Sequence, residues 1–230
     1  MLESRGITKR FGRTEALKDV TLALEAGHVY AMLGPNGSGK TTWMKLAASL
    51  LKPTEGGMYF RGKPVGIASR RHVAYMSTEP FFWRWMSARD VGVFFRRFYP
   101  DFSPERYAAL LDRFELTERM KVSELSSGMT AKLKVAATLS RDADAFLLDE
   151  PFNGIDLIAR EDIAEAILAR LGRDRLIVLS SHLVEELSPV CDRAVFMLNG
   201  RLRAVADTRG PEGQMVRMYR EAYRAWRAEG

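Results

Sequence analysis

The stretch Gly34-Pro35-Asn36-Gly37-Ser38-Gly39-Lys40-Thr41 decides how this chain folds. It follows a short apolar run at residues 29–33 and precedes helix-forming residues 41–51, which Lys52-Pro53 ends. A glycine-rich loop between a strand and a helix turns backbone N–H groups, and the positive end of the helix, toward phosphate. Lys40 adds a charge for the outer phosphates, and the Thr41 hydroxyl can bind Mg²⁺. The loop therefore predicts ATP binding by these eight residues and by Thr42.

The composition is that of an ordinary globular protein. The 230 residues are 47% hydrophobic and 28% charged, which suits one large domain, or a core with a small insert, and argues against wholesale disorder. The net charge of +6, from 35 basic and 29 acidic residues, selects no class of partner. The single cysteine, Cys191, excludes an internal disulfide and predicts a reducing, cytoplasmic setting with Cys191 packed in the interior.

The rest of the chain alternates strand and helix patterns. Strands are expected at residues 16–24, 29–33, 145–148, 176–180 and 194–198, with further short strands in 56–76 broken at 62–64, and a helix at 157–171. Asn199-Gly200 predicts a hairpin turn. These patterns predict an α/β fold with a mostly parallel sheet, and we expect no segment that spans a membrane.

The composition changes between residues 79 and 140, which we predict to be a helical insert. Aromatic residues crowd residues 81–99, and helical periodicity follows at 104–114 and 128–140, with Ser103 as the N-cap of the first. Residues 1–78 and 141–212 then form the α/β core, and 213–230 a C-terminal helix. Its stripe of Met215, Tyr219, Ala222 and Trp226 is expected to pack on the chain's own core, with a partner surface as the alternative.

Two carboxylates follow the apolar strand at 145–148. A buried parallel strand delivers Asp149 and Glu150 to the carboxyl edge of the sheet, where ligands bind in such folds. We predict that Asp149 holds Mg²⁺, directly or through water, and that Glu150 polarises the attacking water.

A third motif, Leu125-Ser126-Ser127-Gly128-Met129, opens the helix that we expect over 128–140. It resembles the L-S-G-G-Q signature of ATP-binding cassette (ABC) transporters, and it lies between the phosphate loop and the acidic strand end as in that family. The resemblance covers nearly the whole chain. It implies the P-loop NTPase (RecA-like) fold, with N-terminal antiparallel strands and an inserted α-helical subdomain.

The resemblance also implies roles for residues outside the three motifs. Phe11 occupies the place of an aromatic that stacks on adenine, although a core aromatic would fit the same pattern. Asn153, Gly154 and Asp156 correspond to a loop that touches the opposite subunit, and His182 matches the histidine that contacts the γ-phosphate.

Two positions depart from the family pattern. Thr78, followed by Glu79, stands where the family usually has a glutamine that helps to sense Mg²⁺ and links ATP to the membrane partner, so this metal contact and this link stay open. Met129 replaces the last signature glutamine and Ser127 the first glycine. Ser126 and the Gly128 backbone, which are expected to face phosphate, remain, and we expect activity to survive.

The resemblance predicts an ATP-hydrolysing motor subunit of a membrane transporter, most similar to bacterial export or resistance types. Glu150, His182 and Lys40 would be catalytic, and Mg²⁺ would accompany ATP. Partners would be an integral membrane subunit, which holds the chain at the cytoplasmic face of the membrane, and a second nucleotide-binding subunit, homo- or heterodimeric, whose signature meets this phosphate loop. No nucleic acid is expected. The alternatives are a soluble ABC ATPase acting on ribosomes or DNA, and an ATP-dependent regulator with low turnover.

Overall fold

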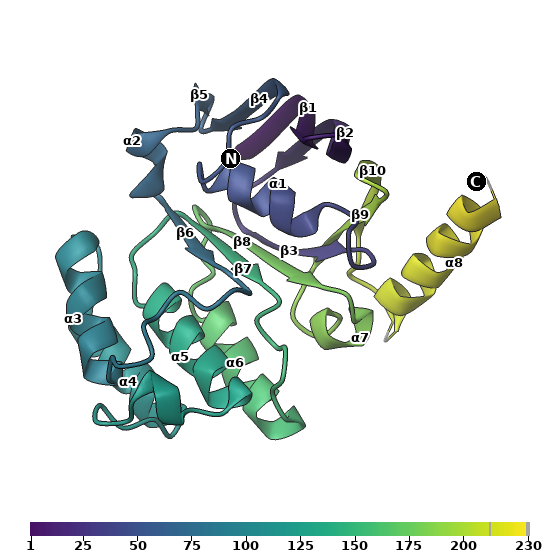
Figure 1. The fold of residues 1–230 in the computed structure, drawn as a ribbon. Helices are drawn as coiled ribbons and strands as arrows, with labels where there is room; N and C mark the ends of the chain where they lie inside the picture. The colour runs from purple at the N-terminus through teal and green to yellow at the C-terminus, as the bar shows by residue number, and fades with distance from the viewer. Residues whose placement is uncertain (212, 229–230) are drawn as a thin grey trace.

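The computed structural model describes residues 1–211 and 213–228 and contains two sheets (Figure 1). The first sheet is antiparallel and has the strand order β2-β1-β4-β5. Its strands are β1 (Leu2–Phe11), β2 (Thr14–Leu24), β4 (Glu55–Phe60) and β5 (Lys63–Pro64). The second sheet has the order β10-β9-β3-β8-β7-β6 and is parallel except for the edge strand β10. Its strands are β3 (His28–Leu33), β6 (Val73–Met76), β7 (Ala145–Asp149), β8 (Leu176–Ser181), β9 (Arg193–Leu198) and β10 (Arg201–Asp207).

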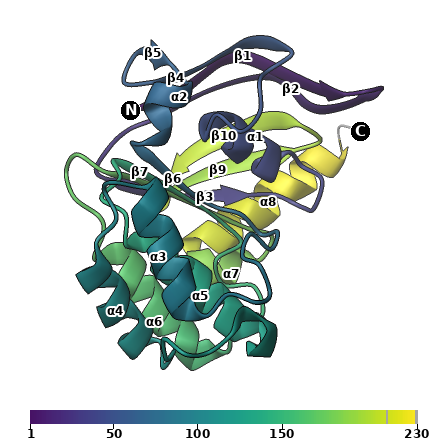
Figure 2. The same ribbon diagram turned by 60° about the vertical axis from the view of Figure 1, so that its left-hand side comes forward.

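The helices divide between the two faces of the second sheet. Helix α1 (Lys40–Ala47) lies between the two sheets, and α3 (Ala88–Phe98), α4 (Pro104–Arg113), α5 (Ser127–Leu139) and α6 (Leu157–Leu168) lie on the opposite face (Figures 1 and 2). The remaining helices are α2 (Ile67–Arg70), a 3₁₀ turn at Val122–Glu124, α7 (Val184–Leu187) and α8 (Gln214–Ala228). Among the described residues, no helix is long and apolar enough to span a membrane.

Strand β3 is covered on both faces, which explains its continuous apolar run. Tyr30 and Met32 join a cluster between the sheets that contains Trp43 of α1, whereas Ala31 and Leu33 join the cluster under the other helices. Trp43 is fully buried, and its indole N–H donates to the Ser4 hydroxyl of β1 at 3.2 Å. The helix that follows the phosphate loop is thereby fixed to the antiparallel sheet.

Several local predictions are confirmed. The five expected strands form, Ser103 caps α4 by accepting from the Arg106 N–H at 3.1 Å, and Asn199-Gly200 joins β9 to β10. Cys191 is buried, and burial raises the pKa of its thiol.

The C-terminal stripe packs on the chain's own core, as predicted. Met215 is buried, and the rings of Tyr219 and Trp226 each lie 6.1 Å from the ring of Phe196 on β9.

Several predicted elements differ from the structure. Helix α1 ends at Ala47 instead of residue 51, because Ser49 adopts a left-handed conformation with φ 58° and the Leu50 N–H bonds back to the Lys45 carbonyl. Residues 63–64, expected as a break, form β5, and a short helix α2 lies within the region expected to contain only strands. Helix α6 ends at Leu168 instead of residue 171.

Arg141 ties the end of the α3–α5 helices to the core. Its side chain is 3% exposed and its guanidinium donates to the carbonyls of Val73 at 3.0 Å and Arg71 at 2.8 Å. It also pairs with Asp101 at 3.1 Å and lies 4.1 Å from the centre of the Tyr99 ring. One buried cation therefore connects β6 and its preceding loop to the chain between α3 and α4.

Replacing Arg141 by Ala should destabilise the protein by about 3 kcal/mol, because the buried carbonyls and Asp101 lose their shared donor. For a chain of this length this corresponds to a fall in Tm of roughly 6–12 °C. Thermal unfolding followed by circular dichroism measures the change. Arg209→Ala is the control, since Arg209 is exposed and pairs with nearby Asp207 on the surface, and its Tm should not change. Equal Tm values for the two variants would contradict this role of Arg141.

Candidate functional site

The register of the parallel sheet brings the predicted site residues to one edge. Asp149 at the end of β7 lies opposite Ser180 of β8, and Leu33 at the end of β3 lies opposite Ser181. The loops that follow these strands therefore meet. They border a cleft of about 560 Å³. The cleft is lined by Phe11, Thr14, Glu15, Ala16, Asn36, Gly37, Ser38, Gly39, Lys40, Thr41, Thr42, Thr78, Glu150, Asn153 and His182.

Two glycines of the phosphate loop have no room for a side chain. A Cβ on Gly34 would lie 2.2 Å from the Met197 carbonyl oxygen, and a Cβ on Gly39 would lie 2.6 Å from the Leu17 side chain. Gly39 also has φ 103°, a conformation that favours glycine. Because Gly39 is the N-cap of α1, no side chain caps the first N–H groups of this helix. These donors, at the positive end of the helix, face the site where an anion would bind.

The β9–β10 hairpin supports the loop from behind. The Gly200 N–H donates to the Ser38 carbonyl at 3.2 Å, and the Gly200 carbonyl accepts from the Lys18 N–H of β2 at 2.8 Å. A Cβ on Gly200 would lie 2.8 Å from the Ala16 carbonyl oxygen. The hairpin, the loop and the antiparallel sheet are therefore in direct backbone contact at one residue.

Lys40 and Ser38 are polar groups whose partners in this chain are incomplete. Lys40 is 6% exposed, and its ammonium donates to the Gly34 and Pro35 carbonyls at 2.7 and 3.2 Å. Burial lowers the pKa of Lys40, and the carboxylates of Glu150 and Asp149 oppose this shift. The Ser38 hydroxyl is buried without a partner in the described part of the chain. A bound phosphate would supply acceptors for both donors, so the loop fits an anionic ligand.

The two adjacent carboxylates have different surroundings. Asp149 is fully buried and accepts hydrogen bonds from the hydroxyls of Ser180 and, at 3.4 Å, Tyr75. Burial, with the Asp149 charge, raises the pKa of Tyr75, which keeps its proton as the donor. Glu150 has φ 53°, rare for a residue with a side chain, and its N–H donates to the Ser180 hydroxyl at 3.0 Å. This turn directs Glu150 into the cleft while Asp149 stays behind it.

Sequence reasoning missed Ser180 and Tyr75. Ser180 contacts both carboxylate residues, and a signal for it was present, since it is the last residue of the strand expected at 176–180 and such strand ends meet at one edge of a parallel sheet. Tyr75 lies on β6, which pairs with β7, but nothing in its sequence context distinguishes it from a core tyrosine.

His182 and Glu150 come together as neighbours in the cleft. The His182 Nδ1 lies 3.0 Å from the Glu150 Oε2. Thr41 and Asp149 offer a hydroxyl and a carboxylate, the hard oxygen ligands that suit Mg²⁺, and among the described residues one Asp149 oxygen has only the long Tyr75 hydrogen bond. The residues present therefore fit a magnesium ion.

The signature lies outside the cleft of its own chain. Ser126 caps α5 by accepting from the Met129 N–H at 3.2 Å, and a Cβ on Gly128 would lie 2.9 Å from the Gly154 carbonyl oxygen. Asp156, at the end of the same loop as Gly154, caps α6 through the Ala159 N–H at 3.0 Å. None of the signature residues Leu125, Ser126, Ser127, Gly128 and Met129 lines the cleft. The structure thus joins the signature to the loop that contains Asn153, Gly154 and Asp156.

Phe11 and Thr78 lie at the border of the cleft. Phe11 is 48% exposed with the Lys9 ammonium 5.0 Å from its ring centre, so it is not a core aromatic. Thr78 lines the cleft, and its carbonyl accepts a hydrogen bond from Lys134 of α5 at 2.8 Å.

Replacing Lys40 by Met should weaken binding of Mg-ATP by at least about tenfold, because a hydrogen bond to a charged group contributes about 1.5–3 kcal/mol. The same change removes a buried cation, so the Tm of the nucleotide-free protein should not fall by more than about 2 °C. Fluorescent-nucleotide titration and thermal unfolding measure the two effects. Lys52→Met, outside the cleft, is the control. Unchanged nucleotide affinity in Lys40→Met would refute the phosphate-loop assignment.

Comparison with known proteins agrees with this architecture. The family described as "ABC transporter" matches residues 17–153. The ABC transporter ATP-binding protein YtrB of Bacillus subtilis is 31% identical over 211 residues, which cover 90% of this chain and 72% of that protein. The Nod factor export ATP-binding protein I of Burkholderia lata is 32% identical over 208 residues, which cover 87% of this chain and 68% of that protein.

Among solved structures, a dimeric ATP-binding cassette in a post-hydrolysis state, bound to ADP and Pi, matches with a TM-score of 0.80. It is 23% identical, and the match covers 92% of this chain and 100% of that one, which shows a shared fold. The sequence match, the fold and the cleft at the carboxyl edge of the sheet lead to one conclusion: this chain belongs to the ABC transporter family, as an ATP-binding subunit.

Proposed function

We propose that this chain is the ATP-hydrolysing motor subunit of a membrane transporter that exports its substrate. The observation that carries the proposal is the pairing of Glu150 and His182 in the cleft that the phosphate loop borders. A chain that only bound nucleotide would not need a carboxylate turned toward the phosphate site by a left-handed backbone conformation. Export is favoured by the relative from Burkholderia lata, whose name describes Nod factor export.

In the proposed reaction, water attacks the γ-phosphorus of ATP in line, the bond from that phosphorus to the β,γ-bridging oxygen breaks, and ADP and phosphate are released. The loop N–H groups and Lys40 hold the phosphates, and Glu150 orients the water and accepts its proton. His182 would keep the Glu150 carboxylate in place through their 3.0 Å contact and would face the γ-phosphate. Thr41 and Asp149 would hold Mg²⁺, which neutralises charge on the phosphate oxygens when bound. Ser180 positions both acidic residues.

The working unit is proposed to be a dimer. Ser126 and Ser127 are exposed at the start of α5 and do not reach the cleft of their own chain. A second subunit, placed with its phosphate loop against this signature, would bring two ATP molecules between the chains. Asn153 and the neighbouring Gly154 and Asp156 would then contact the partner. The dimeric cassette among the solved structures supports this arrangement.

Replacing Glu150 by Gln should stop hydrolysis while ATP still binds, so an ATP-bound dimer should accumulate. Size-exclusion chromatography with light scattering, with and without Mg-ATP, measures the mass. The double variant Glu150→Gln with Lys40→Met is the control and should elute as a monomer, because it lacks the phosphate contact. If Glu150→Gln stays monomeric with saturating ATP, the dimer scheme is wrong for this chain.

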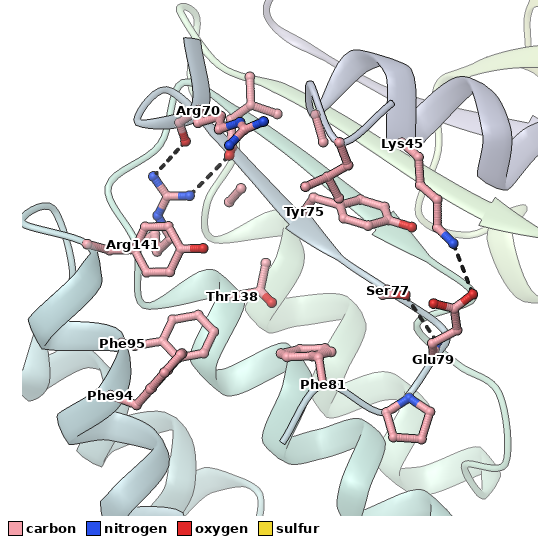
Figure 3. A pocket seen from close by; sticks show the side chains of 16 residues that line it. Lys45, Arg70, Tyr75, Ser77, Glu79, Phe81, Phe94, Phe95, Thr138 and Arg141 are labelled. Atoms are coloured by element: carbon pink, nitrogen blue, oxygen red, sulfur yellow. Dashed lines mark hydrogen bonds and ion pairs between the residues drawn. The ribbon is translucent and has the colours of Figure 1, made fainter. Parts of the chain in front are cut away.

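The membrane partner is proposed to dock beside the aromatic segment of residues 81–99. A groove of about 460 Å³ opens there between the core and α3, with Phe81 and Phe94 at its wall (Figure 3). Next to it the rings of Trp83 and Trp85 stack at 6.1 Å and remain 56% and 68% exposed. Exposed aromatic clusters of this kind are typical of protein interfaces. Docking there would hold the chain at the cytoplasmic face of the membrane.

Other aromatics of the same segment are buried. Phe82 and Phe95 are 8% and 7% exposed and pack against each other with ring centres 6.2 Å apart. The segment therefore serves both as a small core and as a candidate docking surface, and only its exposed members are available to a partner.

Affinity purification of the tagged chain from detergent-solubilised membranes should recover a multi-span membrane protein. The double variant Trp83→Ser with Trp85→Ser should recover at least about tenfold less, since central aromatic residues often contribute 2 kcal/mol or more to an interface. Val205→Ser removes an exposed apolar side chain on β10, away from the groove, and is the control. Recovery with ribosomes or DNA in place of a membrane protein would favour a soluble ABC ATPase.

A further inference from the structure

Ser77, Thr78 and Glu79 form a turn after β6 that borders two different hollows. Thr78 lines the nucleotide cleft, whereas Ser77 and Glu79 line the groove beside the aromatic segment (Figure 3). The turn is short, and the Glu79 N–H donates to the Ser77 hydroxyl at 3.1 Å. A shift of this turn would therefore change both hollows together.

A buried lysine from the signature helix holds this turn. The Lys134 ammonium of α5 donates to the carbonyls of Ser77, Thr78 and Glu79 at 3.1, 2.8 and 2.8 Å. All three of its donors are thereby used on three consecutive residues. Lys134 is 7% exposed, and its ammonium lies 5.3 Å from the centre of the Phe81 ring, within cation–π range.

The chemistry favours a specific role for this lysine. An apolar residue at the same buried position would avoid the cost of removing an ammonium from water, so the three carbonyl contacts must offset that cost. Burial lowers the pKa of Lys134, while the nearby charges of Glu79 and Asp149 oppose the shift.

The second attachment of the turn is weaker. Lys45 of α1 pairs with Glu79 at 2.9 Å (Figure 3), but the Glu79 side chain is 70% exposed. Exposed ion pairs contribute little to stability, because water screens the charges. Lys134 is therefore the main connection of the turn to its surroundings, and Lys45 adds a link to the helix of the phosphate loop.

We infer that Lys134 is a positioning residue that makes the turn of Ser77, Thr78 and Glu79 move as one unit with α5. Because α5 begins at the signature and Lys134 lies about 10 Å along it, a displacement of the signature reaches the turn through a rigid helix. The contact is made to backbone carbonyls, so it does not depend on the short Thr78 side chain. This inference rests on the proposed function, since it describes how nucleotide binding is linked to the docking groove.

Hydrogen exchange of the full-length chain tests the contact without nucleotide. In Lys134→Met the amides of Ser77, Thr78, Glu79 and Phe81 within residues 77–81 should exchange at least about tenfold faster than in the wild type. Lys132→Met is the matched control, because Lys132 lies on the same helix and donates to the Phe114 carbonyl at 3.4 Å, away from the turn. Its exchange at 77–81 should equal that of the wild type. Equal exchange in Lys134→Met and Lys132→Met would overturn the inference.

Steady-state ATPase kinetics separate positioning from simple support of the fold. Lys134→Met should lower kcat at least about fivefold with KM for ATP within about twofold of the wild type, and Lys134→Arg should recover most of kcat. A raised KM with an unchanged kcat would contradict the inference, because it would indicate a role in binding ATP.

A measurement on Glu150→Gln keeps the test independent of whether Lys134 variants fold. Addition of Mg-ATP should change exchange at residues 77–81 and at 127–134 together, and a response confined to one segment would overturn the inference. Failure of the Glu150→Gln variant to bind ATP would instead refute the proposed function. The two failures are distinguishable, because the nucleotide-free exchange comparison requires no ATP.

Discussion

The parallel register of β3, β8 and β7 is the constraint on which the site depends. Pairing of Leu33 with Ser181 and of Asp149 with Ser180 brings three strand ends to one level of the sheet. Each strand is buried on both faces, so a shift by one residue would move apolar side chains out of two packed clusters. The phosphate loop, the acidic pair and His182 are therefore positioned by hydrophobic packing well away from the nucleotide, and their own contacts need only adjust side-chain directions.

At the end of β7, backbone conformation gives the adjacent residues Asp149 and Glu150 different positions. Asp149 continues the strand and remains buried, whereas Glu150 turns out of it in a left-handed conformation. The Ser180 hydroxyl connects the two, as donor to the first and acceptor for the N–H of the second. One side chain on the adjacent strand thus offsets the strain of the turn and orients the carboxylate that would bind metal.

The sequence predicted those parts of the structure in which local pattern and tertiary environment agree. Residues 29–33 are apolar because both faces of β3 are covered, and Ser103-Pro104 begins a helix with a local hydrogen bond from the Arg106 N–H to the Ser103 hydroxyl. The end of α1 was missed because Ser49 has no sequence mark of a left-handed residue. Lys134 was missed because a lysine in an amphipathic helix usually faces solvent, and its contacts come from residues more than fifty positions earlier in the chain.

The contact of Gly200 with the phosphate loop limits which substitutions the β9–β10 hairpin can accept. Two-residue turns between edge strands are ordinarily places where a chain accepts substitution, insertion or a new ligand-binding loop. Here the turn glycine has the Ser38 and Lys18 backbone on either side and no space for a Cβ. Substitution of Gly200 is therefore restricted by the phosphate loop, and an engineer seeking a permissive position on this cassette should look elsewhere.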